Sequence, residues 1–270
     1  EADYKPDMVN QKEHALGVFI DDLPTQEATT SKHMIATDLP GRYPVTSARG
    51  HKYLFLMYDY DSNYIQAILI KSRKSSELTQ AFATCYKTLT AHGFSAKEIR
   101  LDNEISTEFR EYITGANLKY QLASLGDHRT NPAERAIQTF KNHFISIING
   151  MDENFPRGAW DLLLPQTNMT LNTLQACRVN PRHSAYAYIH APLDFNAHAL
   201  APLGCRAIVH ERSIKNGGKQ GSWGNKGRIG YYIGPALKSY QTWRFYIPDT
   251  RAICECDTAK FFPKEALPTV

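Results

Sequence analysis

Residues 53–70 read YLFLMYDYDSNYIQAILI. The first six are all apolar or aromatic, so an extended chain here would present apolar side chains on both faces. That pattern is typical of a central strand in a sheet that is covered on both sides. The polar triplet at 61–63 indicates a turn, and the apolar stretch 64–71 predicts a second strand after it.

Further elements extend on both sides of this hairpin. HMIATDLP (33–40) predicts a preceding strand, and a helix is expected over 77–91, capped by Ser75 or Ser76 and stopped by Gly93. Strand and helix then alternate through KEIRLD, STEFREYIT, NLKYQLA and the stretch after TNP. The order βββαβαβα predicts an α/β protein with a ribonuclease-H-like fold, a mixed sheet flanked by helices.

The C-terminal third has a different pattern. A second long helical stretch is expected over 160–176, and short Gly-rich strand patterns follow from about residue 201. They predict a small β-barrel-like module. We therefore expect an acidic arm or linker at 1–32, a ribonuclease-H-like core at 33–180, a linker at 181–202 and a small β-rich module at 203–265.

Composition describes an ordinary globular protein. The 270 residues are 42% hydrophobic and 21% charged, and no apolar run approaches the roughly 18 residues that span a membrane. The start lacks the features of a signal peptide, and it lacks Met, so we expect a fragment or a processed product. Five irregularly spaced cysteines without a CxxC pair favour a reducing, intracellular environment over disulfides or structural zinc.

Charge is unevenly spread along the chain. Residues 1–30 hold seven acidic and two basic residues, so the net +4 of the whole chain leaves +9 on the remaining 240 residues. Six basic residues lie between 206 and 228, against one Glu. A basic body suits a polyanionic partner, although such an excess is common on proteins that bind nothing charged.

Glu134 has two interpretations. In T-N-P-A-E-R, Asn131 suits an N-cap and Pro132 a first helical position, so Glu134 at the third position could simply close a capping box. The helix beyond it has an apolar stripe of five residues: Ala133, Ile137, Phe140, Phe144 and Ile148.

The adjoining polar face of this helix offers the second interpretation. Glu134, Gln138 and Lys141 form one line, with Arg135 and Asn142 beside it. A carboxylate, an amide and a cation in a row suit a metal ion with a DNA backbone passing it. A merely solvated helix face would have a similar composition.

Asp38 and Asp102 each end a predicted strand. Aspartates favour turns, so both could serve local structure only. Strand ends in α/β sheets are also where ligands and metals bind. Three loosely spaced carboxylates, Asp38, Asp102 and Glu134, prove nothing by themselves.

The sequence segments around these acids are more specific for a protein family when they are taken together. In order, the chain contains IATDLPGRYP, YDYDSN, RLDNE and HRTNPAERAIQTFKN, and later WDLLLPQTNMTLNTL, PLGCRAIVH, GYYIGP and DTAKFFP. Over residues 33–265 these segments resemble the integrases of copia-class LTR retrotransposons, members of the retroviral (DDE) integrase superfamily. Two departures are visible: the interval from Asp102 to Glu134 is a few residues short, and the His/Cys zinc module that normally precedes the core is absent from this sequence.

The resemblance implies an enzyme, a DNA integrase that processes 3′ ends and joins strands. Its catalytic, metal-binding residues would be Asp38, Asp102 and Glu134, holding two Mg²⁺ ions for which Mn²⁺ can substitute. Its partners would be double-stranded DNA and further copies of itself, not a membrane, and it would act inside the cell, in the nucleus during integration. The candidate DNA contacts are eight residues: His128, Arg135, Gln138, Lys141, Lys215, Lys219, Lys226 and Arg228.

Three alternatives stay open at this point. The chain could be a decayed or co-opted DNA-binding protein, a hydrolytic ribonuclease-H-like nuclease, or a scaffold for assembly. Trp223, within the Gly-rich segment at 215–227, could stack on a base or anchor the module.

Overall fold

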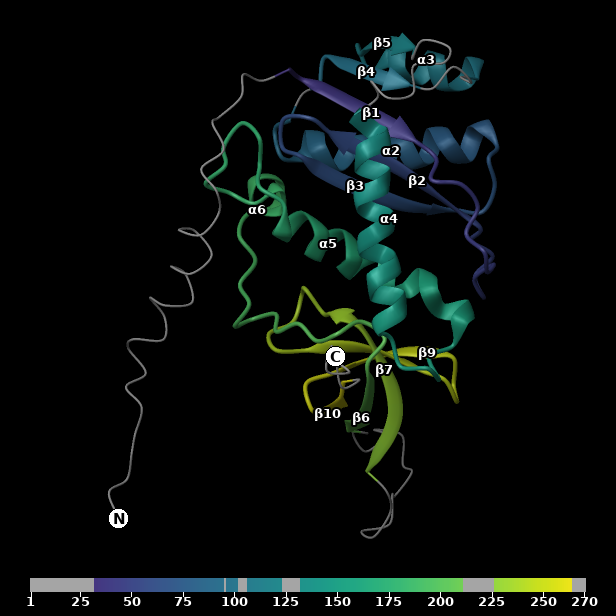
Figure 1. Ribbon diagram of the computed structural model, residues 1–270, viewed down its shortest axis with the longest axis vertical. Coiled ribbons are helices and arrows are strands. Elements are labelled where there is room, and N and C mark those ends of the chain that lie inside the picture. The colour runs from purple at the N-terminus through teal and green to yellow at the C-terminus, as the bar shows by residue number, and fades with distance from the viewer. Residues whose placement is uncertain (1–31, 95, 102–105, 123–131, 211–225, 264–270) are drawn as a thin grey trace, which may run out of the picture.

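The computed structural model describes residues 32–94, 96–101, 106–122, 132–210 and 226–263 (Figure 1). The first part of the chain contains five strands and three helices among the described residues, as the sequence predicted. In chain order they are β1 (Met34–Asp38), β2 (Tyr53–Asp59), β3 (Tyr64–Ile70), α2 (Ser75–Ala91), β4 (Glu98–Leu101), α3 (Thr107–Gly115), β5 (Lys119–Leu122) and α4 (Pro132–Gly150).

The five strands form one mixed sheet in the order β3-β2-β1-β4-β5. β2 runs antiparallel to both β1 and β3, whereas β4 is parallel to β1 and β5 is parallel to β4. This order and these directions, with helices on both faces, confirm the predicted ribonuclease-H-like fold.

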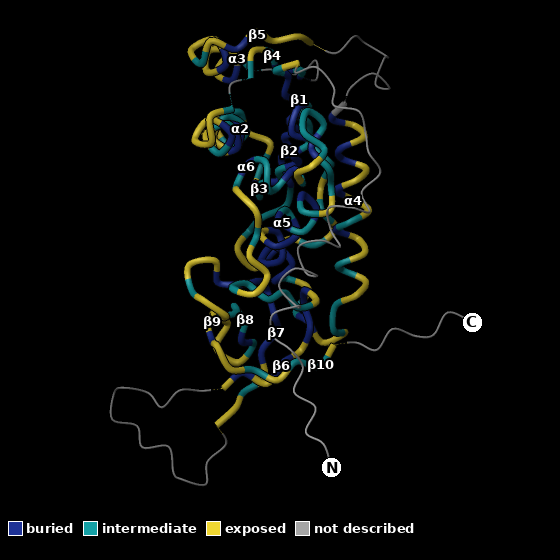
Figure 2. Tube along the Cα trace, turned by 90° about the vertical axis from the view of Figure 1, so that its left-hand side faces the viewer, coloured by how far each residue is buried: buried dark blue, intermediate teal, exposed yellow. Residues whose placement is uncertain are grey.

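Alternation along β2 explains the two layers that cover the sheet. Leu54, Leu56 and Tyr58 pack in one hydrophobic cluster with residues of α4, and Phe55 and Met57 pack in another with residues of α2 and α3. The views in Figures 1 and 2 agree, since α4 lies on one side of the sheet and α2 and α3 lie on the other. The sequence pattern at 53–58 therefore reports burial of both faces.

Three helices follow α4. They are the 3₁₀ helix η2 (Arg157–Leu163), α5 (Leu164–Leu174) and α6 (Ala185–His190). The sequence predicted a long helical stretch over 160–176, and the chain is helical over 157–174. The stretch is divided into a 3₁₀ helix and an α-helix, because Pro165 has no N–H to donate and fits the first turn of an α-helix. α6 lies inside the range predicted as a linker and buries Ala185 and Ile189.

Five more strands form a second, antiparallel sheet in the order β10-β6-β7-β8-β9. They are β6 (Arg206–His210), β7 (Gly227–Pro235), β8 (Trp243–Ile247), β9 (Ala252–Cys256) and β10 (Ala259–Phe262), the last of which was not predicted separately. Within the described residues β10 and β9 are its edges, and this further antiparallel sheet is the small β module that the sequence predicted after the core. Tyr232, Phe245 and other residues of this sheet share one hydrophobic cluster with α4 and α5, and the predicted domain limits remain a prediction.

The N-cap of α2 and the cysteines were also the subject of sequence-based expectations. The N-cap of α2 is Lys74 and has no side-chain cap, not Ser75 or Ser76, because Ser75 is already the first helical residue. Glu77 instead accepts backbone N–H groups of Lys71 and Ser72. All five cysteines are free thiols in the structure.

Candidate active site

Asp38 is the last residue of β1 and is partly buried. Its backbone pairs with Leu56 of β2, and its Oδ1 accepts the N–H of Leu39 at 2.6 Å. Residues that pair directly across two antiparallel strands point to the same face. Because Leu56 packs in the cluster with α4, Asp38 lies on the α4 face of the sheet.

Glu134 is the third residue of α4 and is exposed. The apolar stripe predicted for this helix is confirmed: Ala133, Ile137, Phe140 and Phe144 are buried, and Ile148 is partly buried. The helix packs on β1 and β2, and its N-terminal end lies at the level of β1 in the ribbon of Figure 1 and in the tube of Figure 2. The stripe fixes the helix, so Glu134 projects from the start of the element that covers Asp38.

The carboxyl ends of β1 and β4 lie at the same edge of the sheet, since the two strands are parallel and Ala36 pairs with Arg100. β4 ends at Leu101. Asp102 follows directly and lies outside the described residues, as does the proposed N-cap Asn131. The structure thus brings together β1, which holds Asp38, and α4, which holds Glu134. The end of β4, which leads to Asp102, lies at the same edge of the sheet.

The polar face of α4 matches its predicted composition. Arg135, Gln138, Lys141 and Asn142 are all exposed, and Gln138 Nε2 donates to Asn142 Oδ1 at 2.8 Å. Exposed polar side chains are expected both of a solvated helix face and of a face that binds DNA, so their exposure does not distinguish the two.

Two of the other predicted DNA contacts, Lys226 and Arg228, lie at the start of β7 and not on α4. Lys226 is exposed on the second sheet and lines a hollow of about 360 Å³ with Lys260 and His210. Arg228 is half-buried on β7, opposite Val209. His128, Lys215, Lys219 and Trp223 lie outside the described residues. The second sheet and the β1 edge lie at opposite ends of the molecule (Figure 1).

A metal site at this edge would need Asp102, which lies outside the described residues. Among the described residues no three His, Cys, Asp or Glu side chains gather as a metal site. Asp38 and Glu134 supply the hard carboxylate oxygens that Mg²⁺ prefers. Their chemistry fits such an ion, with Asp102 as the third donor that the sequence offers.

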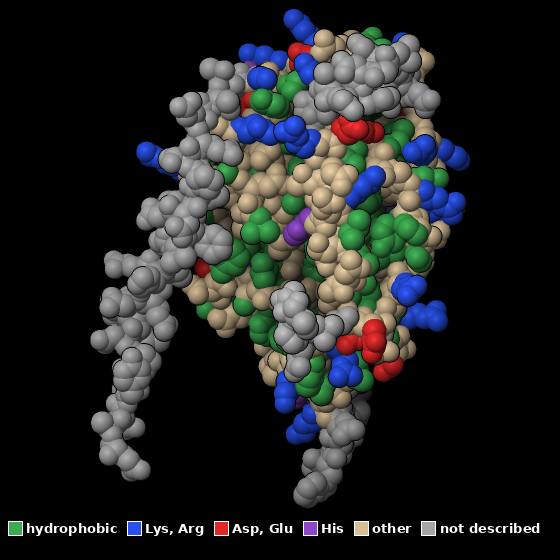
Figure 3. Space-filling model, in the orientation of Figure 1, with side chains coloured by type: hydrophobic (Ala, Val, Ile, Leu, Met, Phe, Trp, Pro, Cys, Tyr) green, Lys and Arg blue, Asp and Glu red, His purple; other side chains and the backbone are tan. Residues whose placement is uncertain are grey.

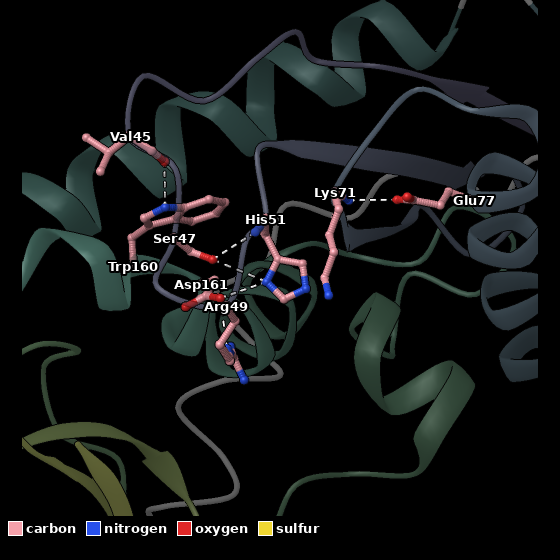
Figure 4. A network of polar contacts seen from close by, with 8 residues as sticks. All are labelled: Val45, Ser47, Arg49, His51, Lys71, Glu77, Trp160 and Asp161. Carbon is pink, nitrogen blue, oxygen red and sulfur yellow. Dashed lines mark hydrogen bonds and ion pairs between the residues drawn. The ribbon is translucent and has the colours of Figure 1, made fainter. Parts of the chain in front are cut away.

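Sequence reasoning missed the segment that follows Asp38. The 14 residues 39–52 connect β1 to β2 and pack against η2, with the indole N–H of Trp160 donating to Val45 O at 2.9 Å. Asp161 accepts from Arg49 Nε at 2.9 Å and contacts His51 Nδ1 at 2.8 Å (Figure 4). Burial alone would raise the pKa of Asp161, but hydrogen bonds from Arg49, His51 and Ser47 hold it below its ordinary value. The signal in the sequence for this segment was its charge, because residues 39–52 contain three Lys and Arg residues and no acid.

The part of the chain that the structure describes has no helix both long and apolar enough to cross a membrane. Neither protein-family models nor curated proteins match this chain. Solved structures similar to it include three integrase structures. The HTLV-2 integrase catalytic core domain in complex with magnesium is 21% identical over 60% of this chain and 99% of that one, with a TM-score of 0.45.

The simian T-cell lymphotropic virus intasome, in complex with PP2A regulatory subunit B56 gamma, is 14% identical over 90% of this chain and 82% of that one, with a TM-score of 0.47. The catalytic core domain of BIV integrase is 12% identical over 59% and 94%, with a TM-score of 0.44. Likeness at this level leaves the function of this chain to be argued from its own residues.

Proposed function

We propose that this chain is a DNA integrase of the copia-class retrotransposon type, a polynucleotidyl transferase with Asp38, Asp102 and Glu134 as its catalytic carboxylates. One observation carries the proposal: Asp38 ends β1 on the α4 face, α4 packs on β1 and holds Glu134 in its first turn, and β4 ends at the same edge one residue before Asp102. The sequence segments around all three acids support the same assignment.

The three carboxylates would hold two divalent ions, Mg²⁺ or Mn²⁺, without any covalent intermediate on the protein. When bound, such ions supply Lewis-acid activation of an attacking oxygen and neutralise charge on the phosphoryl group. Asp38 is held by its place at a strand end and by the N–H of Leu39, so one ligand is fixed by the sheet. Glu134 belongs to a helix whose position is set by its buried stripe, so the second ligand is fixed from above.

Substrate contacts would come from the exposed face of α4. Arg135 and Lys141 would bind phosphate oxygens, and Gln138 would donate a neutral hydrogen bond. The nucleophile would be water for processing of a 3′ end and a 3′-hydroxyl for strand joining. Duplex DNA as substrate, self-association on it and action in the nucleus belong to the same proposal.

Strand joining, or its reversal on a branched oligonucleotide, tests the assignment with Mg²⁺ and then with Mn²⁺. The variants are Asp102→Asn and Glu134→Gln, and the matched control is Glu108→Gln, an exposed acid in the first turn of α3. We expect metal-dependent joining in the wild type and the control, and its loss in both test variants with an unchanged fold by circular dichroism. Retained joining in either test variant, or an inactive wild type, would contradict the proposal.

A further inference from the structure

Two connections at one end of the sheet contain cations and no acid. Residues 39–52 (LPGRYPVTSARGHK) join β1 to β2, and residues 71–76 (KSRKSS) join β3 to α2 and form its first residues. Together they hold six Lys and Arg residues, and the surface that these six form is named the cationic shelf: Arg42, Arg49, Lys52, Lys71, Arg73 and Lys74. All are exposed except Lys52, which is half-buried.

The two connections lie side by side. The N–H of Lys52 donates to Ile70 O at 3.2 Å, so the start of β2 is joined to the end of β3. A methyl group placed on Gly50, whose φ is +87°, would lie 3.9 Å from Cδ and Cε of Lys71. Arg73 lies over the ring of Tyr53 with 5.5 Å between guanidinium carbon and centroid. The six charges therefore form one surface rather than two.

This surface lies at the same edge of the sheet as Asp38. β1 and β2 are antiparallel, and so are β2 and β3, which places the end of β1, the start of β2 and the end of β3 together. In Figure 3 Lys and Arg side chains line the right-hand side of the face, and acidic atoms lie inward of them in its upper part. A ligand that passes the candidate carboxylates along this edge would meet the shelf next.

The shelf is rigidly supported. The N–H of Ala48 donates to Gly158 O at 2.8 Å, and Tyr43 stacks on Trp160 with 4.1 Å between ring centroids. Asp161, almost completely buried, fixes Arg49 and His51 from below (Figure 4). A surface whose backbone is already ordered binds without a further loss of loop entropy.

Two acids that contact residues of the two connections, Asp161 and Glu77, are already engaged. Asp161 bonds Arg49, which keeps a side chain 49% exposed, and Glu77 accepts two backbone N–H groups and the hydroxyl of Ser72. Two acids against six cations leave a strong positive excess. Such an excess on a fixed, open surface suits the regular charges of a nucleic acid backbone, which cations bind without reading sequence.

We propose that the cationic shelf binds the phosphate backbone of double-stranded DNA on the side of the candidate active site that lies beyond β1, toward β3. The inference rests on the proposed function and extends it, because none of these six residues belongs to the predicted DNA contacts. The shelf positions the duplex and does not touch the reacting atoms.

The test uses the full chain and a fluorescently labelled DNA duplex, with binding measured by anisotropy at several salt concentrations. The shelf variant is Arg42→Gln, Lys71→Gln, Lys74→Gln, which leaves Arg49 and its buried partner untouched. The matched control is Lys87→Gln, Arg110→Gln, Lys238→Gln, three exposed cations elsewhere on the fold. Thermal unfolding of both confirms that neither variant is misfolded.

We expect the shelf variant to bind at least about 10-fold more weakly and to lower the slope of log K against log [salt] by about 2 to 3, since each lost phosphate contact contributes about 0.9. The control should change affinity by less than about 2-fold, because distant cations release no counterions from the bound duplex. Strand joining by the shelf variant should show a raised KM and an unchanged kcat.

Equal weakening of both variants, or none in the shelf variant, would overturn the inference and leave the proposed function intact. A wild type that does not bind duplex DNA would contradict both the inference and the proposed function. An effect confined to an RNA duplex of the same length would assign the shelf to a different ligand and also overturn it. Glu134→Gln separates the two proposals further, since it should abolish joining and keep the affinity for DNA.

Discussion

The side-chain amide of Asn172 pairs with both backbone groups of Ile65, accepting its N–H at 2.8 Å and donating to its carbonyl at 2.7 Å. Four residues earlier in α5, Asn168 makes the same two-point contact with Ala67, at 3.2 and 2.9 Å. β3 is the last strand on its side of the sheet. Two helical amides thus take the place of a neighbouring strand and cover an edge that would otherwise be open to pairing with another chain.

Asn172→Ala should strongly destabilise the protein. Asn172 is fully buried, so the variant would leave the N–H and the carbonyl of Ile65 without these partners. Each unsatisfied buried group costs about 1–3 kcal/mol, and we expect a fall of about 3 kcal/mol in the free energy of unfolding. Urea denaturation measures it. Thr173→Ala is the control, because the Thr173 hydroxyl bonds only within α5 through its contact with Met169 O, and an equal loss there would contradict the account.

Asp161→Asn should loosen the support of the cationic shelf at neutral pH. The folded pKa of Asp161 is below its unfolded value, so its stabilisation is present above the unfolded pKa and disappears as the pH falls through the folded one. We expect the variant to lose about 1–3 kcal/mol near pH 7 and to approach the wild type below about pH 4. Thermal unfolding between pH 3 and pH 8 checks this, and a pH-independent difference would argue against the ion pairs as its cause.

The fold was largely predictable because its signals are local. The apolar run at 53–58 and the stripe on α4 each report burial that the structure confirms. The split between η2 and α5 was missed because Pro165 suits the first turn of a helix, and helical periodicity alone hides where that turn begins.

The candidate site was predictable only in part. The ends of β1 and β4 follow from strand patterns, but the pairing of Asp38 with Leu56, which sets its face, depends on register between distant segments. The contact of Asp161 with Arg49 joins residues 112 positions apart, and the clustering of 39–52 with 71–76 needs the β2–β3 hairpin to close. No local pattern encodes such distances.

Asp59→Asn should stabilise the protein at neutral pH. Burial raises the pKa of Asp59 to about 6, against the opposing hydrogen bonds from Ser62, and the charge of Asp61 raises it further. A raised pKa means that the stabilisation by the protonated form is complete below the unfolded pKa and is lost as the pH rises through about 6.

The wild type should therefore lose stability from this group between about pH 4 and pH 7, whereas the Asn variant should not. At pH 7.5 we expect Asp59→Asn to exceed the wild type by on the order of 2 kcal/mol, and near pH 4 to match it. Urea titrations at both pH values provide the measurement. Asp257→Asn, at an exposed position between β9 and β10, is the control. An Asn variant less stable than the wild type at pH 7.5 would show that the charged form is the one the fold favours.

Asp38→Cys should distinguish a metal ligand from a turn residue. A thiolate is a soft ligand that Mg²⁺ binds poorly and that later first-row divalent ions accept more readily. If Asp38 holds a metal ion, strand joining by the variant should fall by about 1,000-fold with Mg²⁺, roughly 4 kcal/mol in the barrier. Replacing Mg²⁺ by Mn²⁺ should raise the rate of strand joining by this variant at least about 10-fold, since sulfur ligands bind Mn²⁺ better than Mg²⁺. Asp38→Ser lacks the thiolate and should stay inactive with both ions. Equal activity of the Cys and Ser variants with Mn²⁺ would mean that Asp38 serves only its bond to the N–H of Leu39.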